Sequence, residues 1–75
     1  MERYKNLSGD SGVVAYETDS DSIKVEFEDG GLYLYTYTST GITKIEQMKA
    51  LASSGKGLAT FIVRHVREAY AAKLR

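Results

Sequence analysis

Residues 23–37 constrain the fold more than any other part of this sequence. In the first half of this stretch apolar and charged residues alternate, so Ile23, Val25 and Phe27 share one face of an extended chain. An aspartate and two glycines follow, and glycine suits a hairpin loop because it adopts positive φ without steric cost. The chain then returns with a tyrosine at every second position, from 33 to 37. This pattern predicts a β-hairpin whose apolar face must be covered by the rest of the chain, since an isolated hairpin is only marginally stable in water.

The length of the hairpin loop decides which way the tyrosines face. A two-residue loop would leave them on the charged face of the hairpin, as an exposed aromatic strip. A three-residue loop through Gly31, with this glycine in the left-handed region, would turn them to the apolar face. In that register the tyrosines lie beside apolar residues of the first strand: Tyr33 beside Phe27, and Tyr35 beside Val25. We favour the three-residue loop, because three aromatic side chains bury more apolar area than two leucines and a threonine.

The residues before the hairpin predict one further strand and an arm. Residues 1–12 are rich in glycine, serine, asparagine and aspartate, which predicts a flexible N-terminal arm. Val13 to Thr18 is β-branched and aromatic, as is typical of a strand. Four polar residues separate it from the hairpin, so it should pair with the hairpin in the antiparallel direction. The result is a three-stranded antiparallel meander.

Two helical patterns follow the hairpin. Thr43 and Glu46 have the spacing of a capping box, and the apolar positions behind them predict a helix of about three turns that closes at Gly55. A second apolar stripe begins at Leu58 and runs to Leu74, which predicts a longer helix. Both helices should pack on one face of the meander. We therefore predict a single α+β domain over residues 13–75, in the order β-β-β-α-α.

Composition limits the chemistry available to the chain. Its 75 residues are enough for one domain, and the absence of cysteine excludes disulfides and thiolate metal sites. His65 is the only histidine, and it falls on or beside the apolar stripe of the last helix, where a partly buried structural role is expected. Carboxylates cluster only at turns. We therefore predict a protein that is not an enzyme, with no catalytic residues, no metal site and no cofactor.

Hydropathy predicts no membrane partner. No apolar run approaches the ~20 residues of a membrane span. The first twelve residues also lack the apolar stretch of a signal peptide. A cytoplasmic location follows as the prediction.

Charge is unevenly distributed along the chain, although the net charge is zero. Residues 1–41 contain eight acidic and three basic residues, whereas residues 42–75 contain two acidic and seven basic residues. Such a distribution suits either a polyanion bound to the second half or head-to-tail self-association.

A short pattern in the middle and at the end of the chain is similar to that of a known family. It has four parts in chain order: Val25-x-Phe27 with a glycine pair behind it, Tyr33-x-Tyr35, a Ser/Gly-rich break, and Val66-Arg67-x-x-Tyr70. This pattern resembles the KTSC domain, a short module found at the C-terminus of some lysyl-tRNA synthetases and as a stand-alone bacterial protein. The resemblance extends from about Val13 to Tyr70. It implies a small domain of undetermined function, for which RNA binding is suggested.

The candidate binding residues follow from this resemblance and from the charges. Lys56 lies in a Ser/Gly-rich segment ahead of a helix, where it could help to bind an anion, although a plain connector between helices explains the segment as well. Arg64 and Arg67 could contact phosphates, or could simply solvate a helix face. Tyr33 and Tyr35 could stack on unpaired bases, or could pack in the core.

Two functions from different classes fit the sequence. The first is a small non-enzymatic module that binds RNA or another polyanion through these five residues. The alternative is a protein-interaction or self-associating module, in which an acidic sheet half meets a basic helical half, or an exposed strand edge pairs with a partner.

Overall fold

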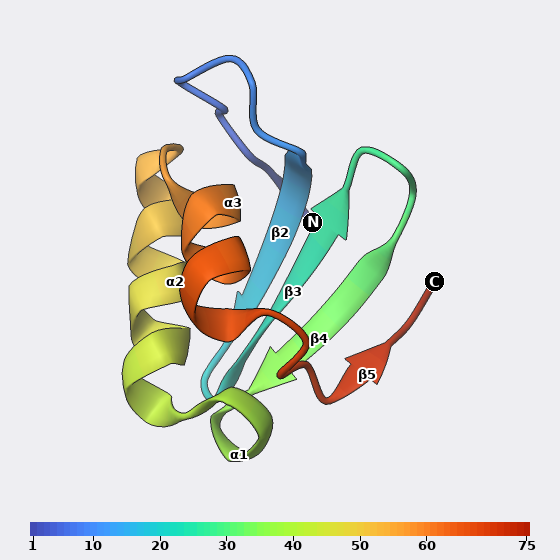
Figure 1. Ribbon diagram of the computed structural model, residues 1–75, viewed down its shortest axis with the longest axis vertical. Coiled ribbons are helices and arrows are strands. Elements are labelled where there is room, and N and C mark those ends of the chain that lie inside the picture. Colours follow the sequence, from blue (N-terminus) through green and yellow to red (C-terminus); the bar gives the residue numbers. More distant parts are fainter.

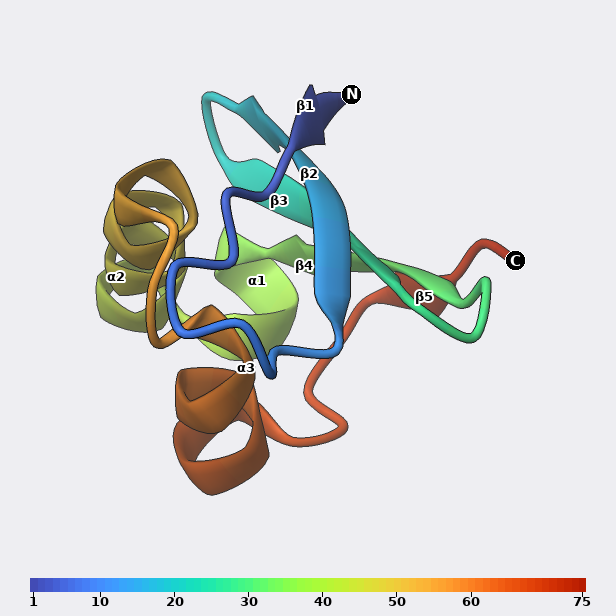
Figure 2. The ribbon, with the colours of Figure 1, turned by 90° about the horizontal axis from the view of Figure 1, so that it is seen from above.

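A five-stranded antiparallel sheet forms one layer of the molecule, and the helices form the other. The computed structural model describes residues 1–75. The strands lie side by side in chain order: β1 (Glu2–Arg3), β2 (Val13–Asp19), β3 (Ser22–Phe27), β4 (Leu32–Thr36) and β5 (Ala72–Lys73). All the helices lie on the same face of this sheet, and the other face is open (Figures 1 and 2). The predicted α+β class and the one-sided helical layer are therefore confirmed.

All four helical segments lie between β4 and β5 along the chain. They are α1 (Tyr37–Thr40), α2 (Ile42–Ser54), α3 (Leu58–Phe61) and the π-helix η1 (Ile62–Val66), which continues α3 directly. The helix predicted to close at Gly55 is confirmed as α2, whose C-cap glycine has a φ of 80°. The predicted capping box is wrong, because Gly41 is the N-cap of α2 and makes no side-chain hydrogen bond. A capping box occurs instead seven residues earlier, between Thr36, the N-cap of α1, and Ser39.

The β3–β4 hairpin has the predicted loop length but a different register. Phe27 donates its backbone N–H to the carbonyl of Gly31 at 2.8 Å, which leaves a three-residue loop that ends at Gly30. Gly30, with a φ of 92°, takes the left-handed conformation that was predicted for Gly31. The pairs are consequently Val25 with Tyr33 and Ile23 with Tyr35, two residues away from the predicted pairs. Because a shift of two residues preserves the faces, the tyrosines still lie on the apolar face, as predicted.

The core lies between the sheet and the helices and draws residues from both layers. Tyr35, Ile23, Val25 and Val13 come from the sheet, and Tyr4 comes from the segment between β1 and β2. The helices supply the rest of the buried apolar set: Ile45, Met48, Ala52, Leu58, Ile62 and Val66. Many of these side chains are fully buried, and no buried side-chain nitrogen or oxygen lacks a hydrogen bond. The apolar face of β3 and the apolar face of α2 thus pack against each other in this core. None of the helices has the length and apolar character needed to cross a membrane.

The N-terminal residues, predicted to be a flexible arm outside the domain, are packed against it. Glu2 and Arg3 form the edge strand β1 beside β2, and the side chain of Tyr4 is only 4% exposed. The Tyr4 hydroxyl accepts a hydrogen bond from the backbone N–H of Leu58 at 3.3 Å. Further along, Leu7 donates its backbone N–H to the carbonyl of Gly55 at 2.8 Å. Tyr4 and these hydrogen bonds attach the polar N-terminal segment to the domain. The composition of residues 1–12 gave no indication of this attachment.

The C-terminal residues, predicted to continue the last helix to Leu74, form a strand instead. The helix ends at Arg67, whose φ of 53° and ψ of −119° are not helical. The chain then turns back, and β5 pairs with β4 through backbone bonds such as Ala71 N–H to Leu34 C=O at 2.7 Å. This pairing satisfies backbone groups along β4 that would otherwise form an unpaired sheet edge. The order β-β-β-α-α is therefore wrong at both ends of the chain, where β1 and β5 are added. His65, which precedes this turn, is exposed rather than partly buried.

The turn between α2 and α3 provides a test of how the N-terminal segment is packed. A Cβ atom on Gly55 would lie 2.6 Å from the Cβ of Lys5, whereas one on Gly57 would meet nothing closer than 3.6 Å. Both glycines have positive φ, 80° and 86°, so both alanine variants carry the same backbone cost of about 1–2 kcal/mol. We expect Gly55→Ala to lower the free energy of unfolding by about 1 kcal/mol more than Gly57→Ala, because Lys5 must move. Urea denaturation followed by circular dichroism measures the difference, and equal losses would contradict a packed N-terminal segment.

Candidate functional site

An open hollow lies between the β3–β4 loop and the end of η1. Its volume is about 530 Å³. We call it the aromatic hollow, and its lining comprises Gly12, Phe27, Glu28, Asp29, Tyr33, Tyr35, Ile62, Val63, Arg67, Glu68 and Tyr70. Three residues predicted from the sequence as a binding site therefore meet here: Tyr33, Tyr35 and Arg67.

Four aromatic rings form one wall of the aromatic hollow. The Tyr33 ring meets Phe27 edge-on with 5.6 Å between centroids, and it meets Tyr70 at 4.8 Å with an interplanar angle of 61°. Tyr70 also contacts Tyr35 edge-on at 6.2 Å. Such edge-to-face contacts stabilise aromatic clusters beyond their buried area, by about 0.5–1.5 kcal/mol per pair. The wall is therefore fixed by its own packing.

The two predicted tyrosines differ in how much ring surface they offer. Tyr35 is only 2% exposed, and burial, followed by the neighbouring phenols of Tyr33 and Tyr70, raises its pKa to about 12. Tyr33 and Tyr70 are only half-buried. Tyr35 thus belongs to the core, as the packing alternative stated, whereas Tyr33 and Tyr70 provide aromatic surface that a ligand could contact.

Tyr70 is held in the wall by the segment that follows η1. The hydroxyl of Thr40, on α1, donates a hydrogen bond to the backbone carbonyl of Ala69 at 2.7 Å. The backbone N–H of Ala71, on the other side of Tyr70, donates to β4. These contacts anchor both neighbours of the tyrosine, so its position depends on the non-helical path of residues 67–71.

The charged residues around the aromatic hollow are predominantly acidic. Glu28 and Asp29 lie in the β3–β4 loop and Glu68 follows η1, whereas Arg67 is the single base in the lining. None of these four side chains forms an ion pair, since the ion pairs of the chain involve other carboxylates. The Asp29 carboxylate accepts a hydrogen bond from the Gly31 backbone N–H at 2.9 Å. An acidic surface of this kind repels phosphate groups and attracts cations.

Arg67 has an unusual backbone conformation at the edge of the hollow. It is one of two non-glycine residues with positive φ, and its ψ of −119° belongs to a region that favours glycine. Its backbone N–H donates to the carbonyl of Ile62 at 2.6 Å, which closes the π-turn. Such a conformation costs about 1–3 kcal/mol, and residues of this kind cluster at functional sites.

The other two predicted basic residues lie outside the aromatic hollow. Lys56 lines a separate hollow of about 300 Å³ with Ser8, Asp10 and Ser11. It precedes the helical segment 58–66, which Arg67 follows, so the two bases lie roughly 15 Å apart along the helix axis. Arg64 is exposed on η1 and lines neither hollow.

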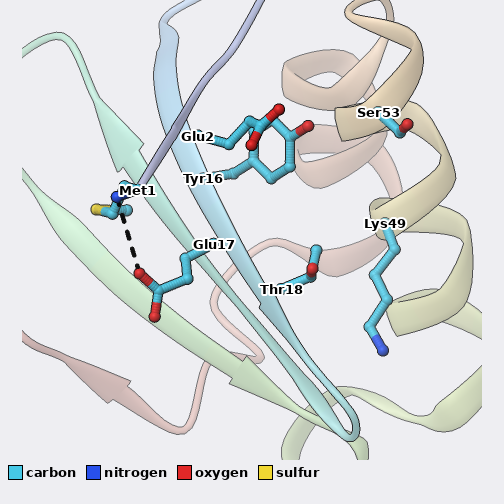
Figure 3. A pocket seen from close by; sticks show the side chains of 7 residues that line it. All are labelled: Met1, Glu2, Tyr16, Glu17, Thr18, Lys49 and Ser53. Atoms are coloured by element: carbon cyan, nitrogen blue, oxygen red, sulfur yellow. Dashed lines mark ion pairs between the residues drawn. The ribbon is translucent and has the colours of Figure 1, made fainter.

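A further hollow, shown in Figure 3, lies between β2 and α2 and has a volume of about 690 Å³. Its lining is mainly polar and comprises Met1, Glu2, Tyr16, Glu17, Thr18, Lys49 and Ser53. Most of the charged groups here already have partners within the chain. Glu17 pairs with the amino group of Met1 at 3.9 Å (Figure 3). Lys49 pairs with Glu46 at 3.0 Å, and only Glu2 has no ion pair. Burial, together with the Glu2 carboxylate, raises the pKa of Tyr16. The aromatic hollow, with unpaired charges and an apolar wall, is the stronger candidate for a binding site.

The comparisons with known proteins give no relative. No family model, curated protein or solved structure matches this chain. The resemblance to the KTSC domain therefore rests on the sequence pattern alone. Five residues of that pattern line the aromatic hollow: Phe27, Tyr33, Tyr35, Arg67 and Tyr70.

Sequence reasoning missed Glu68 and Tyr70 as members of this site. Both fell on a helix that was predicted to continue past them to Leu74. No proline or glycine marks the end of the helix at Arg67, so the sequence gives no signal for the turn. Glu28 and Asp29 were interpreted only as turn residues, because nothing in the sequence shows what the loop faces.

Proposed function

We propose that this protein is a small non-enzymatic binding module, and that the aromatic hollow receives a segment of another protein. One observation supports this most: half-buried tyrosine rings and unpaired carboxylates line the same open hollow. Aromatic rings provide large, rigid contact area, and exposed ones are typical anchors of protein interfaces. The kinship with the KTSC domain is part of this proposal and is supported by the pattern residues that surround the hollow.

Binding of RNA or another polyanion is the second candidate. It is supported by the basic second half of the chain, in which Lys56, Arg64 and Arg67 form no ion pair. At the aromatic hollow, however, a phosphate group would meet three carboxylates and one guanidinium. The tyrosines could therefore stack on bases only against this repulsion, and we favour a protein segment as the ligand.

Nuclear magnetic resonance of the ¹⁵N-labelled chain separates the two candidates. The probes are a single-stranded oligouridine and short capped peptides that combine leucine with a charged or neutral neighbour. We expect the peptides to shift the backbone amides of Gly12, Tyr33 and Glu68, and the RNA to leave them unmoved. RNA that shifts these amides, with an affinity that falls steeply with salt, would replace the proposal with the second candidate.

A pair of matched variants locates the binding. Tyr70→Leu removes an aromatic ring from the hollow, and we expect peptide affinity to fall by roughly fivefold or more, as is common for an interface tyrosine. Tyr16→Leu is the control, because Tyr16 is also half-buried but lines the hollow between β2 and α2. Equal affinity in the two variants would show that the aromatic hollow is not the peptide site.

A further inference from the structure

We infer that the group received by the aromatic hollow is a positively charged side chain, an arginine or a lysine of the partner protein. The inference rests on the proposed function and names the chemistry of its ligand. Three features of the hollow carry it: the rings, the carboxylates and the position of the chain's own bases.

The aromatic rings are one half of a site for a cation. The face of a tyrosine ring carries partial negative charge and attracts an ammonium or guanidinium group within about 6 Å of its centroid. The chain itself uses Tyr33 in this way, since the Nζ atom of Lys73, opposite Tyr33 in the sheet, lies 5.7 Å from the ring centroid. Tyr70, which packs on Tyr33, adds a second half-buried ring.

The carboxylates are the other half. Glu28 and Asp29 approach from the hairpin loop, and Glu68 approaches from the residue after the helical turn, so two separate segments contribute the charge. Arg67 is in the same lining, yet it pairs with none of them within 4 Å. An incoming cation would therefore reduce the repulsion among three unpaired acids. An incoming anion would increase it.

The remaining C-terminal bases leave the three carboxylates of the hollow without an ion-pair partner. Arg75 pairs with Glu26 at 2.7 Å. Lys73 lies over the Tyr33 ring, but it is outside the residues that line the hollow and pairs with none of these acids. A partner is thus needed to provide the charge. Arginine suits the site because its planar guanidinium both stacks on aromatic faces and pairs with carboxylates, and lysine offers the same charge on a flexible stem.

The test uses peptides that differ only in this charge. We compare acetyl-Gly-Leu-Arg-Gly-amide with the same peptide carrying citrulline, and the lysine peptide with its norleucine counterpart. Each cationic peptide is expected to bind roughly fivefold or more tightly than its neutral counterpart, with the same amides of the hollow shifted. If the neutral peptides shift these amides with equal affinity, the inference fails and the proposed function stands. If no peptide shifts them, the proposed function fails as well.

Two double variants with the same change in net charge show which carboxylates cause the preference for cationic peptides. Glu28→Gln with Glu68→Gln should remove most of the preference for the cationic peptides. Asp10→Asn with Asp21→Asn should preserve it, because these exposed acids lie outside the hollow. Loss of the preference in both variants would show a long-range effect of net charge and overturn the inference.

Sedimentation velocity at rising protein concentration tests a second copy as the occupant. We expect a monomer throughout. A dimer that is lost in the Glu28→Gln, Glu68→Gln variant would identify the cation as belonging to another copy of this chain, and would overturn the inference of a separate partner.

Discussion

Replacing Tyr35 with alanine is expected to lower the free energy of unfolding by about 3–5 kcal/mol, the usual cost of removing a large buried aromatic side chain. Tyr35 is the largest of the fully buried side chains, and it joins the sheet to the aromatic hollow through its contact with Tyr70. A domain of 75 residues buries a limited core, so a loss of this size is a large part of its stability. The urea midpoint, followed by circular dichroism, should fall sharply or the variant should be unfolded without urea.

Tyr35→Phe is the control for this prediction, because it keeps the ring and removes only the hydroxyl. No hydrogen bond within the chain involves that hydroxyl, so at neutral pH we expect a loss below about 1 kcal/mol. A loss as large as that of the alanine variant would contradict the view that ring burial is what stabilises this position.

The same control predicts a difference at high pH. Burial raises the pKa of Tyr35 in the folded chain to about 12, above the ordinary value of 10.0. The neutral phenol is thus favoured in the folded state, and its contribution is complete below pH 10 and is lost as the pH rises towards 12. Wild-type protein should therefore lose stability faster than Tyr35→Phe in this interval.

The parts of the fold that the sequence predicted correctly depend on local patterns. Alternation in Ile23, Val25 and Phe27 placed β3 with its apolar face inward, and aromatic area decided which face Tyr33 and Tyr35 occupy. The exact pairs were wrong by two residues, because both Gly30 and Gly31 can adopt positive φ and the sequence cannot choose between them. A shift by one residue would move the tyrosines to the other face of the sheet, whereas a shift by two residues leaves them on the same face. The predicted face is therefore correct although the predicted pairs are not.

The parts that the sequence did not predict depend on contacts between distant residues. β5 exists because β4 presents an edge, and the segment after Arg67 reaches it through a backbone conformation that an arginine rarely adopts. The interpretation of residues 67–74 as helix was reasonable on periodicity, but tertiary pairing overrode it. This turn also places Glu68 and Tyr70 at the aromatic hollow. Because the turn was not predicted, these two residues were not recognised as part of the candidate site.

The candidate site was thus predicted in part. Tyr33, Tyr35 and Arg67 were singled out for a polyanion, and the fold gathers them in one hollow. Lys56 and Arg64 were grouped with them by charge alone, and charge along the sequence carries no information about distance in space. The loop acids Glu28 and Asp29 line the same hollow as the tyrosines, and for this reason we propose a cationic ligand in place of the polyanion expected from the sequence.

Replacing Tyr4 with alanine should be nearly as damaging as the change at Tyr35, with a loss of about 3–5 kcal/mol. Tyr4 is 4% exposed, and its hydroxyl accepts the hydrogen bond that satisfies the first backbone N–H of α3. The variant would therefore leave a cavity and an unpaired amide at a helix N-terminus, where few other partners are available. Urea denaturation measures the loss, and hydrogen exchange of the β2 and α3 amides should accelerate with it.

Leu7→Ala provides the matched control within the same segment. Leu7 is 66% exposed, so its replacement removes almost no buried surface and should change the free energy of unfolding by less than about 0.5 kcal/mol. If the two variants unfold at the same urea concentration, residues 1–12 form the flexible arm that their composition predicts. A large loss for Tyr4→Ala alone means that one aromatic side chain, the fourth residue of this sequence, closes the core between the edge of the sheet and α3.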